Sequence, residues 1–112
     1  MSTMLLDEMT LECLRNCTEC HNVCLRTAVD EDVVERVSAA DLKLLLNCAE
    51  ICRTSADFLD VLSNYHREVC RVCSEICDNC AVMCAQSGLD AMLRCAETCR
   101  TCAASCRRMA AG

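Results

Sequence analysis

The chain of 112 residues is long enough for one domain with one hydrophobic core, and we expect residues 1–112 to form a single domain. Its net charge of −6 and its aromatic content of 2% argue against nucleic acid and anionic membrane surfaces as partners. The absence of Pro and the presence of only two Gly favour long helices, and without an apolar run of about 18 residues no membrane span is expected.

The first predicted element is a helix over residues 3–27, with Ser2 or Thr3 as its N-cap. Its cysteines lie at alternating spacings of four and three residues: Cys13, Cys17, Cys20 and Cys24. This alternation is typical of the buried seam of a helix, whereas a strand would need a period of two.

Residues 30–37 form an acidic, β-branched connection in which we expect a short helical turn. The sequence from Ser38 to Asp41 resembles a capping box and predicts the start of a second long helix. That helix should end near Ser63 or Asn64, either of which would cap the next helix. Its seam contains Cys48, Cys52, Ser55, Leu59 and Leu62. Because the seam changes from cysteine to apolar residues, one corner of the core should be ordinary hydrocarbon.

The third long helix should end before Gly88, which suits a left-handed position, and Asp90 suits the N-cap of the fourth. Arg107 and Arg108 fall in the last turn of the fourth helix, where cations suit the helix dipole. The seam of the third helix contains Cys70, Cys73, Cys77, Cys80 and Cys84, and that of the fourth contains Cys95, Cys99, Cys102 and Cys106. The pattern predicts an all-α fold, an antiparallel up-and-down four-helix bundle with a Cys-lined core.

Fifteen Cys in so short a chain usually indicate a secreted disulfide scaffold, but three features favour free thiols. The count is odd, residues 1–8 lack the basic and apolar regions of a secretory signal, and the chain is not loop-rich. Neighbouring Cβ atoms on a helix are also roughly 5–6 Å apart, against about 3.8 Å in a disulfide. We therefore expect a protein of the reducing cytoplasm.

A core of cysteine in place of leucine would lose about 1–3 kcal/mol per position, so plain packing is a poor explanation of these seams. A metal ion with bonds of about 2.3 Å can bridge sulfurs roughly 4–4.6 Å apart. Soft thiolates select copper(I), zinc or iron–sulfur clusters, and iron–sulfur ligands usually lie in loops. Fifteen buried thiolates carry −15, which copper(I) can match about one for one. A zinc-binding or metallothionein-like structural module and a thiol redox protein stay open as alternatives.

The Cys-x3-Cys-x2-Cys-x3-Cys pattern at 13–24, 73–84 and 95–106, with the shorter Cys48-Ala-Glu-Ile-Cys52, resembles the bacterial copper storage proteins, in particular their cytosolic branch. The resemblance covers nearly the whole chain. It implies a homotetramer of bundles, each storing many copper(I) ions through all fifteen cysteines. Cytosolic relatives often have histidines between the third and fourth helices, and residues 86–92 of this chain have none.

Softer ligands extend the seams at one end of the predicted bundle: Met9, His66 and Met109. Thioether and imidazole groups there would form a metal-entry rim that passes copper(I) inward. We expect Met92 to fill the opposite end and His21 to lie beside the seam. Extra apolar residues on the second long helix, such as Leu46 and Val61, indicate a subunit contact. No catalytic constellation is present in the sequence, so we do not expect an enzyme.

Overall fold

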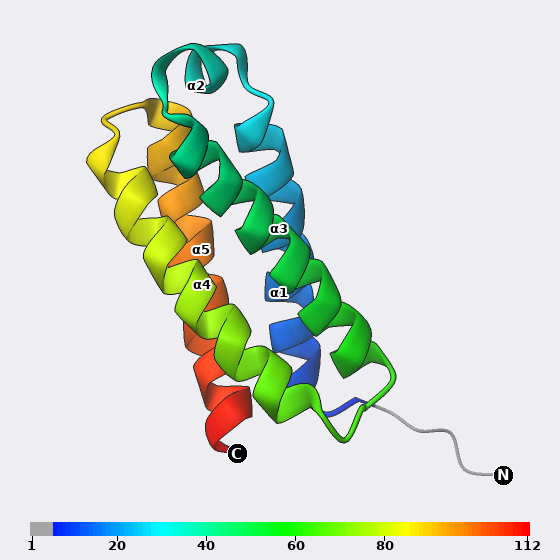
Figure 1. Cartoon of the computed structure of the whole chain (residues 1–112). Coiled ribbons are helices and arrows are strands. Elements are labelled where there is room, and N and C mark those ends of the chain that lie inside the picture. The colour runs from blue at the N-terminus through cyan, green and yellow to red at the C-terminus, as the bar shows by residue number, and fades with distance from the viewer. Residues whose placement is uncertain (1–5) are drawn as a thin grey trace, which may run out of the picture.

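The computed structural model describes residues 6–112, which contain five helices and no strand. The four long helices are α1 (Glu8–Ala28), α3 (Ala39–Asp60), α4 (His66–Gln86) and α5 (Asp90–Ala111), and the short α2 (Glu31–Arg36) connects α1 to α3. Each long helix packs against two others in the cyclic order α1, α3, α4, α5 (Figure 1). The predicted antiparallel four-helix bundle is therefore confirmed, including the short helical turn in the connection.

The two ends of the bundle are built differently (Figure 1). One end, which we call the α2 end, carries α2 and the α4–α5 turn. The other, which we call the His66 end, carries the start of α1, the α3–α4 turn and the C-terminus. In α1, α4 and α5 the first and last cysteines therefore lie toward opposite ends of the bundle.

Side-chain caps fix the start of the first three helices. Asp7 accepts a hydrogen bond from the Thr10 amide at 2.7 Å, Asp30 caps α2, and Ser38 caps α3 as predicted. The helix α1 begins later than predicted, at Glu8, because Asp7 is its N-cap and Leu6 is not helical. Ser2 and Thr3, the predicted caps, lie outside the described residues.

The α3–α4 turn also differs from the prediction. The α3 helix ends at Asp60 because Leu62 takes a left-handed conformation, with φ of 51°. The Ser63 amide donates to the Phe58 carbonyl at 2.9 Å and the Leu62 amide to the Leu59 carbonyl at 3.1 Å, which together form a Schellman motif. Leu62 is consequently exposed in the turn and does not continue the buried seam.

The beginnings of α4 and α5 lack the side-chain caps that we predicted. Tyr65, rather than Ser63 or Asn64, occupies the N-cap of α4. The Ser63 hydroxyl accepts a hydrogen bond from the Tyr65 amide at 3.0 Å. Leu89 occupies the N-cap of α5, so Asp90 is the first helical residue rather than the cap. Gly88 has the predicted left-handed conformation, with φ of 77°.

Small residues beside the cysteines let the helices approach closely. Ala49, Ala81, Ala96 and Ala103 are all buried on the flanks of the seams. On the outside, Arg107 pairs with Asp78 across α5 and α4 at 2.6 Å. Such exposed ion pairs contribute at most about 1 kcal/mol each, so burial of the seams dominates the stability. None of the helices in residues 6–112 is long and apolar enough to cross a membrane.

Candidate metal centre

All fifteen cysteines point into the bundle and are completely buried. All of them lie in the described part of the chain, and none forms a disulfide. The helical seams predicted from the spacing are therefore confirmed. We call this column of sulfurs the thiol ladder: Cys13, Cys17, Cys20, Cys24, Cys48, Cys52, Cys70, Cys73, Cys77, Cys80, Cys84, Cys95, Cys99, Cys102 and Cys106.

Sulfurs on neighbouring helices approach more closely than sulfurs one turn apart on the same helix. The Sγ atoms of Cys52 and Cys77 are 3.5 Å apart, and those of Cys48 and Cys77 are 3.6 Å apart. Along α4, the Sγ atoms of Cys73 and Cys77 are 3.9 Å apart. These separations are slightly shorter than the 4–4.6 Å expected from the sequence, and far longer than the S–S bond of about 2.05 Å. They suit one metal ion held between two or more sulfurs.

Four overlapping groups of thiols have all their sulfurs within 4.8 Å of one another. They are Cys13/Cys70/Cys106, Cys17/Cys73/Cys102/Cys106, Cys20/Cys52/Cys77/Cys102 and Cys20/Cys24/Cys48/Cys99. Neighbouring groups share a member, because Cys20, Cys102 and Cys106 each occur in two of them. The ladder is thus a continuous run of possible metal sites rather than a set of separate ones.

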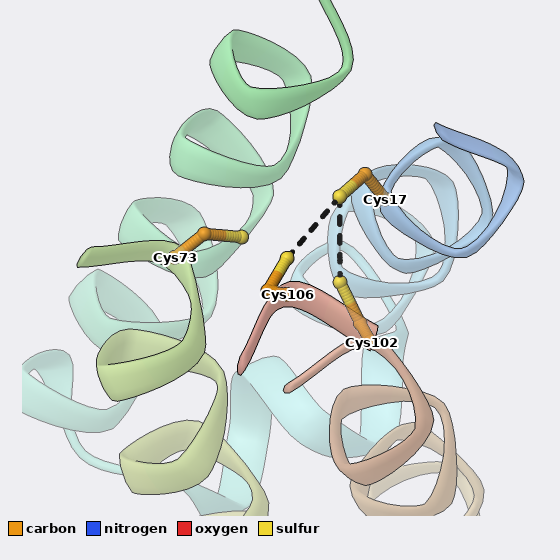
Figure 2. Close-up of side chains that lie close together, drawn as sticks. All are labelled: Cys17, Cys73, Cys102 and Cys106. Carbon is orange, nitrogen blue, oxygen red and sulfur yellow. Dashed lines mark hydrogen bonds between the residues drawn. The ribbon is translucent and has the colours of Figure 1, made fainter. Parts of the chain in front are cut away.

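Figure 2 shows the group nearest the His66 end that contains four thiols. The Sγ of Cys17 lies 3.5 Å from that of Cys106 and 3.8 Å from that of Cys102, while Cys73 faces them from α4. Three different helices therefore contribute to one group. A metal ion bound there would cross-link α1, α4 and α5.

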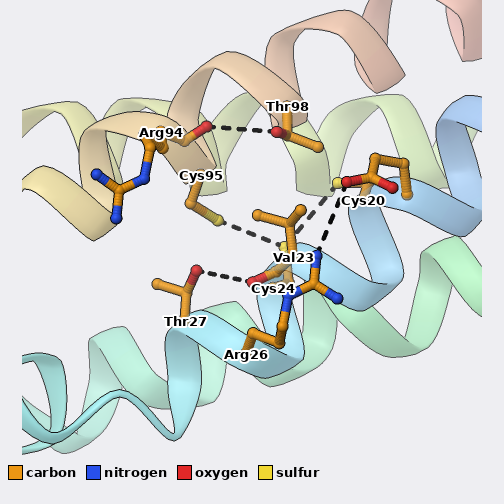
Figure 3. A network of polar contacts seen from close by, with 9 residues as sticks. Cys20, Val23, Cys24, Arg26, Thr27, Arg94, Cys95 and Thr98 are labelled. Carbon is orange, nitrogen blue, oxygen red and sulfur yellow. Dashed lines mark hydrogen bonds and ion pairs between the residues drawn. The ribbon is translucent and has the colours of Figure 1, made fainter.

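Toward the α2 end the ladder continues through pairs. The Sγ atoms of Cys24 and Cys95 are 3.7 Å apart across α1 and α5 (Figure 3), and those of Cys80 and Cys84 are 4.0 Å apart along α4. On the outside of this region Thr27 and Thr98 donate to carbonyls of their own helices. The hydroxyls of Thr27 and Thr98 are therefore hydrogen-bonded within their own helices, and the sulfurs of this region contact one another.

The thiols polarise each other in this dry environment. Hydrogen bonds with Cys102 and Cys106 lower the pKa of the Cys17 thiol to about 6, although burial opposes that shift. A hydrogen bond with Cys24 likewise lowers the pKa of the Cys95 thiol to about 4. The thiols of the ladder therefore differ in how readily they lose a proton. A fully deprotonated ladder would carry −15, which a buried core tolerates only with matching cations.

At the His66 end a small cavity of about 20 Å³ lies beyond the last cysteines. We call it the rim cavity, and it is lined by Thr10, Leu59, Leu62, His66 and Met109. The structure thus brings together two of the three predicted rim residues. Met9 is 49% exposed and does not line the cavity, because the buried residue that continues the α1 seam is Thr10. The sequence pattern does not single out Thr10, because Met9 and Thr10 both lie within about one turn of Cys13.

The imidazole of His66 has a defined hydrogen bond. Its Nδ1 lies 2.8 Å from the carbonyl oxygen of Ser63. A carbonyl oxygen only accepts, so Nδ1 carries the proton, and Nε2 of the neutral ring keeps its lone pair. His66 can therefore offer one nitrogen ligand at the rim cavity. His21 is held instead against the Ala49 carbonyl on the bundle's flank, as expected.

The α2 end is closed by apolar side chains. Val33, Leu45 and Met92 are completely buried beyond the last cysteines of that end, and we call them the apolar plug. Met92 was predicted to fill this end, and its burial confirms the prediction. None of these three plug residues offers a nitrogen ligand, as His66 does at the rim cavity.

One buried side chain in the α3 seam is neither thiol nor hydrocarbon. Ser55 is completely buried, and its hydroxyl lies 3.6 Å from the Cys17 sulfur and 3.5 Å from the Cys70 sulfur. The expected hydrocarbon corner is therefore reduced to Leu59, because Ser55 contacts thiols and Leu62 is exposed.

Comparison with known proteins agrees with this geometry. The family model described as copper storage protein matches residues 3–111. An uncharacterised cysteine-rich protein of Bacillus subtilis is 32% identical over 104 residues, which are 93% of this chain and 92% of the relative. The crystal structure of the Nmul_A1745 protein of Nitrosospira multiformis has a TM-score of 0.87 at 44% identity, covering 94% of this chain and 97% of that one.

A third similar structure contains copper. It shows copper loading, with five coppers, of a cytosolic copper storage protein from Streptomyces lividans. Its TM-score is 0.82 at 25% identity, and the match covers 94% of each chain.

Proposed function

The chain belongs to the copper storage protein family, and we propose that it binds and stores multiple copper(I) ions along its thiol ladder, with all fifteen cysteines as ligands. The observation that carries this proposal is the overlap of the thiol groups, in which Cys20, Cys102 and Cys106 each belong to two. A shared sulfur has to bridge two ions when both groups are filled. The copper-loaded Streptomyces relative supports the same cargo.

Charge supports copper(I) as the cargo. Each copper(I) that replaces a thiol proton leaves the net charge of the core unchanged, so filling the ladder adds no buried charge. Thiolate is also the soft ligand that copper(I) prefers. Storage of this kind needs no catalytic step, and the proposed role is binding alone.

Zinc is the second candidate, because three of the groups contain four sulfurs within 4.8 Å of one another, the ligand number of a structural zinc site. Only two of these groups have no thiol in common: Cys17/Cys73/Cys102/Cys106 and Cys20/Cys24/Cys48/Cys99. Zinc would therefore fill few sites and leave other thiols idle. A competition experiment separates the two metals, since displacement of bound copper(I) by zinc would favour the zinc module.

We also propose that the rim cavity is the entry for copper, through His66 and Met109, with Met9 outside it. A thioether and a neutral imidazole bind copper(I) without adding negative charge. The position of the cavity, directly beyond the terminal cysteines Cys13 and Cys106, supports this route.

We further propose a homotetramer that works in the cytoplasm and whose residues 1–112 act as one domain. Exposed apolar residues, among them Leu46 on α3 and Val61 at its C-cap, support a subunit contact. The cytosolic description of the Streptomyces relative supports the location. Light scattering of the purified protein gives the oligomeric state directly.

The central test is an anaerobic titration of the reduced protein with copper(I) against a chromophoric chelator. We expect saturation at roughly seven ions or more per chain, at least one for every two of the fifteen thiols. Saturation near one or two ions would contradict storage. Slow alkylation of the thiols in the folded apo-protein would count against the alternative of a thiol redox protein, which needs an accessible, reactive cysteine.

A further inference from the structure

The inward seam of α3 changes character halfway along the bundle. It runs from Leu45 through Cys48 and Cys52 to Ser55 and Leu59, all of them buried. Ser55 stands three residues after Cys52, at the spacing that places a cysteine on the other seams. A hydroxyl therefore occupies a place on the ladder where a thiol would continue it.

The contacts of Ser55 place it within a layer of the ladder. Its Oγ lies 3.6 Å from Sγ of Cys17 on α1 and 3.5 Å from Sγ of Cys70 on α4. The Cys17 sulfur is in turn 3.5 Å from that of Cys106 on α5. Ser55 thus places an oxygen from α3 between a thiol of α1 and a thiol of α4.

The next layer shows what is missing. There Cys20, Cys52, Cys77 and Cys102 come one from each long helix, and all four sulfurs lie within 4.8 Å of one another. At the His66 end, the thiol group that contains Cys70, which Ser55 contacts, has only three members from three helices: Cys13, Cys70 and Cys106. The layer at the His66 end is therefore one thiolate short.

Oxygen and sulfur differ sharply as ligands for copper(I). A serine hydroxyl is neutral and hard, so it is a poor partner for a soft monovalent ion. The Ser55 hydroxyl accepts from the Cys17 thiol, so its own O–H can donate to Cys70, and a hydrogen bond to the Cys70 thiolate withdraws electron density from that sulfur. Both effects weaken copper binding in the layer that contains Ser55.

On the basis of the proposed copper storage, we propose that Ser55 makes the layer at the His66 end the exchangeable layer of the store. Copper(I) held by Cys13, Cys70 and Cys106 binds less tightly than copper deeper in the ladder and leaves first. This layer adjoins the rim cavity. The protein can thus give up a few ions to a receptor while the remainder stays bound.

The test compares Ser55→Cys and Ser55→Ala with the unmodified protein. Each is loaded with copper(I) without oxygen and then mixed with excess bathocuproine disulfonate, and the release of copper is followed by absorbance. The unmodified protein should show a fast phase followed by slow release. Ser55→Cys should slow the fast phase about tenfold, the factor produced by about 1.4 kcal/mol of extra binding, and should raise the capacity slightly. Ser55→Ala adds no thiolate and should keep the fast phase.

Ser105→Cys is a matched control. Ser105 is also buried, but its hydroxyl donates to the Cys102 carbonyl at 3.0 Å, beside the seam rather than within the ladder. The added thiol should leave the fast phase unchanged. An unchanged fast phase in Ser55→Cys, or a slowing in Ser55→Ala or Ser105→Cys as large as that in Ser55→Cys, would each overturn the proposal that the missing thiolate at Ser55 sets the fast phase. If the unmodified protein binds only one or two ions, the storage function itself fails, whatever the variants do.

Discussion

The two ends of the bundle differ in what lies beyond the last sulfurs. At the α2 end the apolar plug closes the core with Val33, Leu45 and Met92, all completely buried. At the His66 end a small cavity, an imidazole and a thioether lie beyond Cys13 and Cys106. The four long helices, with α2, therefore have a seal at one end and a polar, ligand-bearing rim at the other. On the proposed route of entry, a few residues outside the ladder set the direction in which copper(I) moves.

The largest expected effect comes from removing part of the seal. Leu45→Ala should lower the free energy of unfolding of the apo-protein by about 2–5 kcal/mol, because a buried leucine leaves a cavity. Urea unfolding monitored by circular dichroism measures this change. Leu93→Ala, beside Met92 on α5 but exposed, should change stability by no more than about 0.5 kcal/mol. Equal losses in the two variants would show that the plug does not seal the core.

Acidity should weaken copper binding at both ends. A hydrogen bond with Cys106 lowers the pKa of Cys70, but a hydrogen bond with Cys13 and burial outweigh it and raise the pKa to about 11. Cys70 is therefore protonated at neutral pH and must lose its proton to bind copper(I). At the α2 end Cys84 also has a raised pKa, because a hydrogen bond with Cys80, which lowers it, is outweighed by one with Cys95 and by burial.

Each thiol that releases a proton should thus weaken the apparent affinity by up to about tenfold for each unit that the pH falls. Chelator competition at pH values between 8 and 6 measures the dependence. A flat profile would mean that these thiols are already ionised in the apo-protein.

The rim should control rate rather than capacity. Replacing Met9, His66 and Met109 together with Leu should slow copper uptake severalfold and leave the final stoichiometry unchanged, because every thiol remains. Stopped-flow loading from a weak chelator donor measures the rate. Met9→Leu alone should have little effect, since Met9 does not line the rim cavity.

Met92→Leu in the apolar plug is the matched control at the opposite end, and it should load at the normal rate. Slower loading in that variant than in the rim variant would reverse the assignment of the two ends.

The smallest expected effect on stability is at the α3–α4 turn. Leu62→Gly removes the strain of a left-handed leucine, about 1–2 kcal/mol. It also raises the conformational entropy of the unfolded chain, which lowers stability by about 0.4–1 kcal/mol, and it removes the packing of the leucine side chain. The net change in unfolding free energy should be within about 1 kcal/mol. Copper uptake should nevertheless become faster, because Leu62 lines the rim cavity. Slower uptake would show that the leucine guides the ion rather than obstructing it.

Much of the ladder could be predicted from the sequence, because a helix turns so regularly that spacings of three and four fix which face each cysteine occupies. The cap at Ser38 and the left-handed Gly88 carried recognisable signals as well. The fold followed from these local rules.

The details of the His66 end could not be predicted in the same way. The left-handed position of the Schellman motif is occupied by Leu62 rather than by glycine, so the sequence carries no signal for this turn. The choice between Met9 and Thr10 depends on about one third of a helical turn, and the rim cavity depends on side chains from four helices meeting. Ser55 was visible on the seam, but its contacts with the thiols of two other helices needed three-dimensional packing.

The apolar plug has a consequence for the history of each stored ion. If copper(I) enters and leaves only at the rim cavity, as proposed, the ion that binds last is the first to be released. The oldest copper then rests deepest, beside Cys24 and Cys95. Loading first with one stable copper isotope and then with another, followed by partial withdrawal, should return mainly the second isotope.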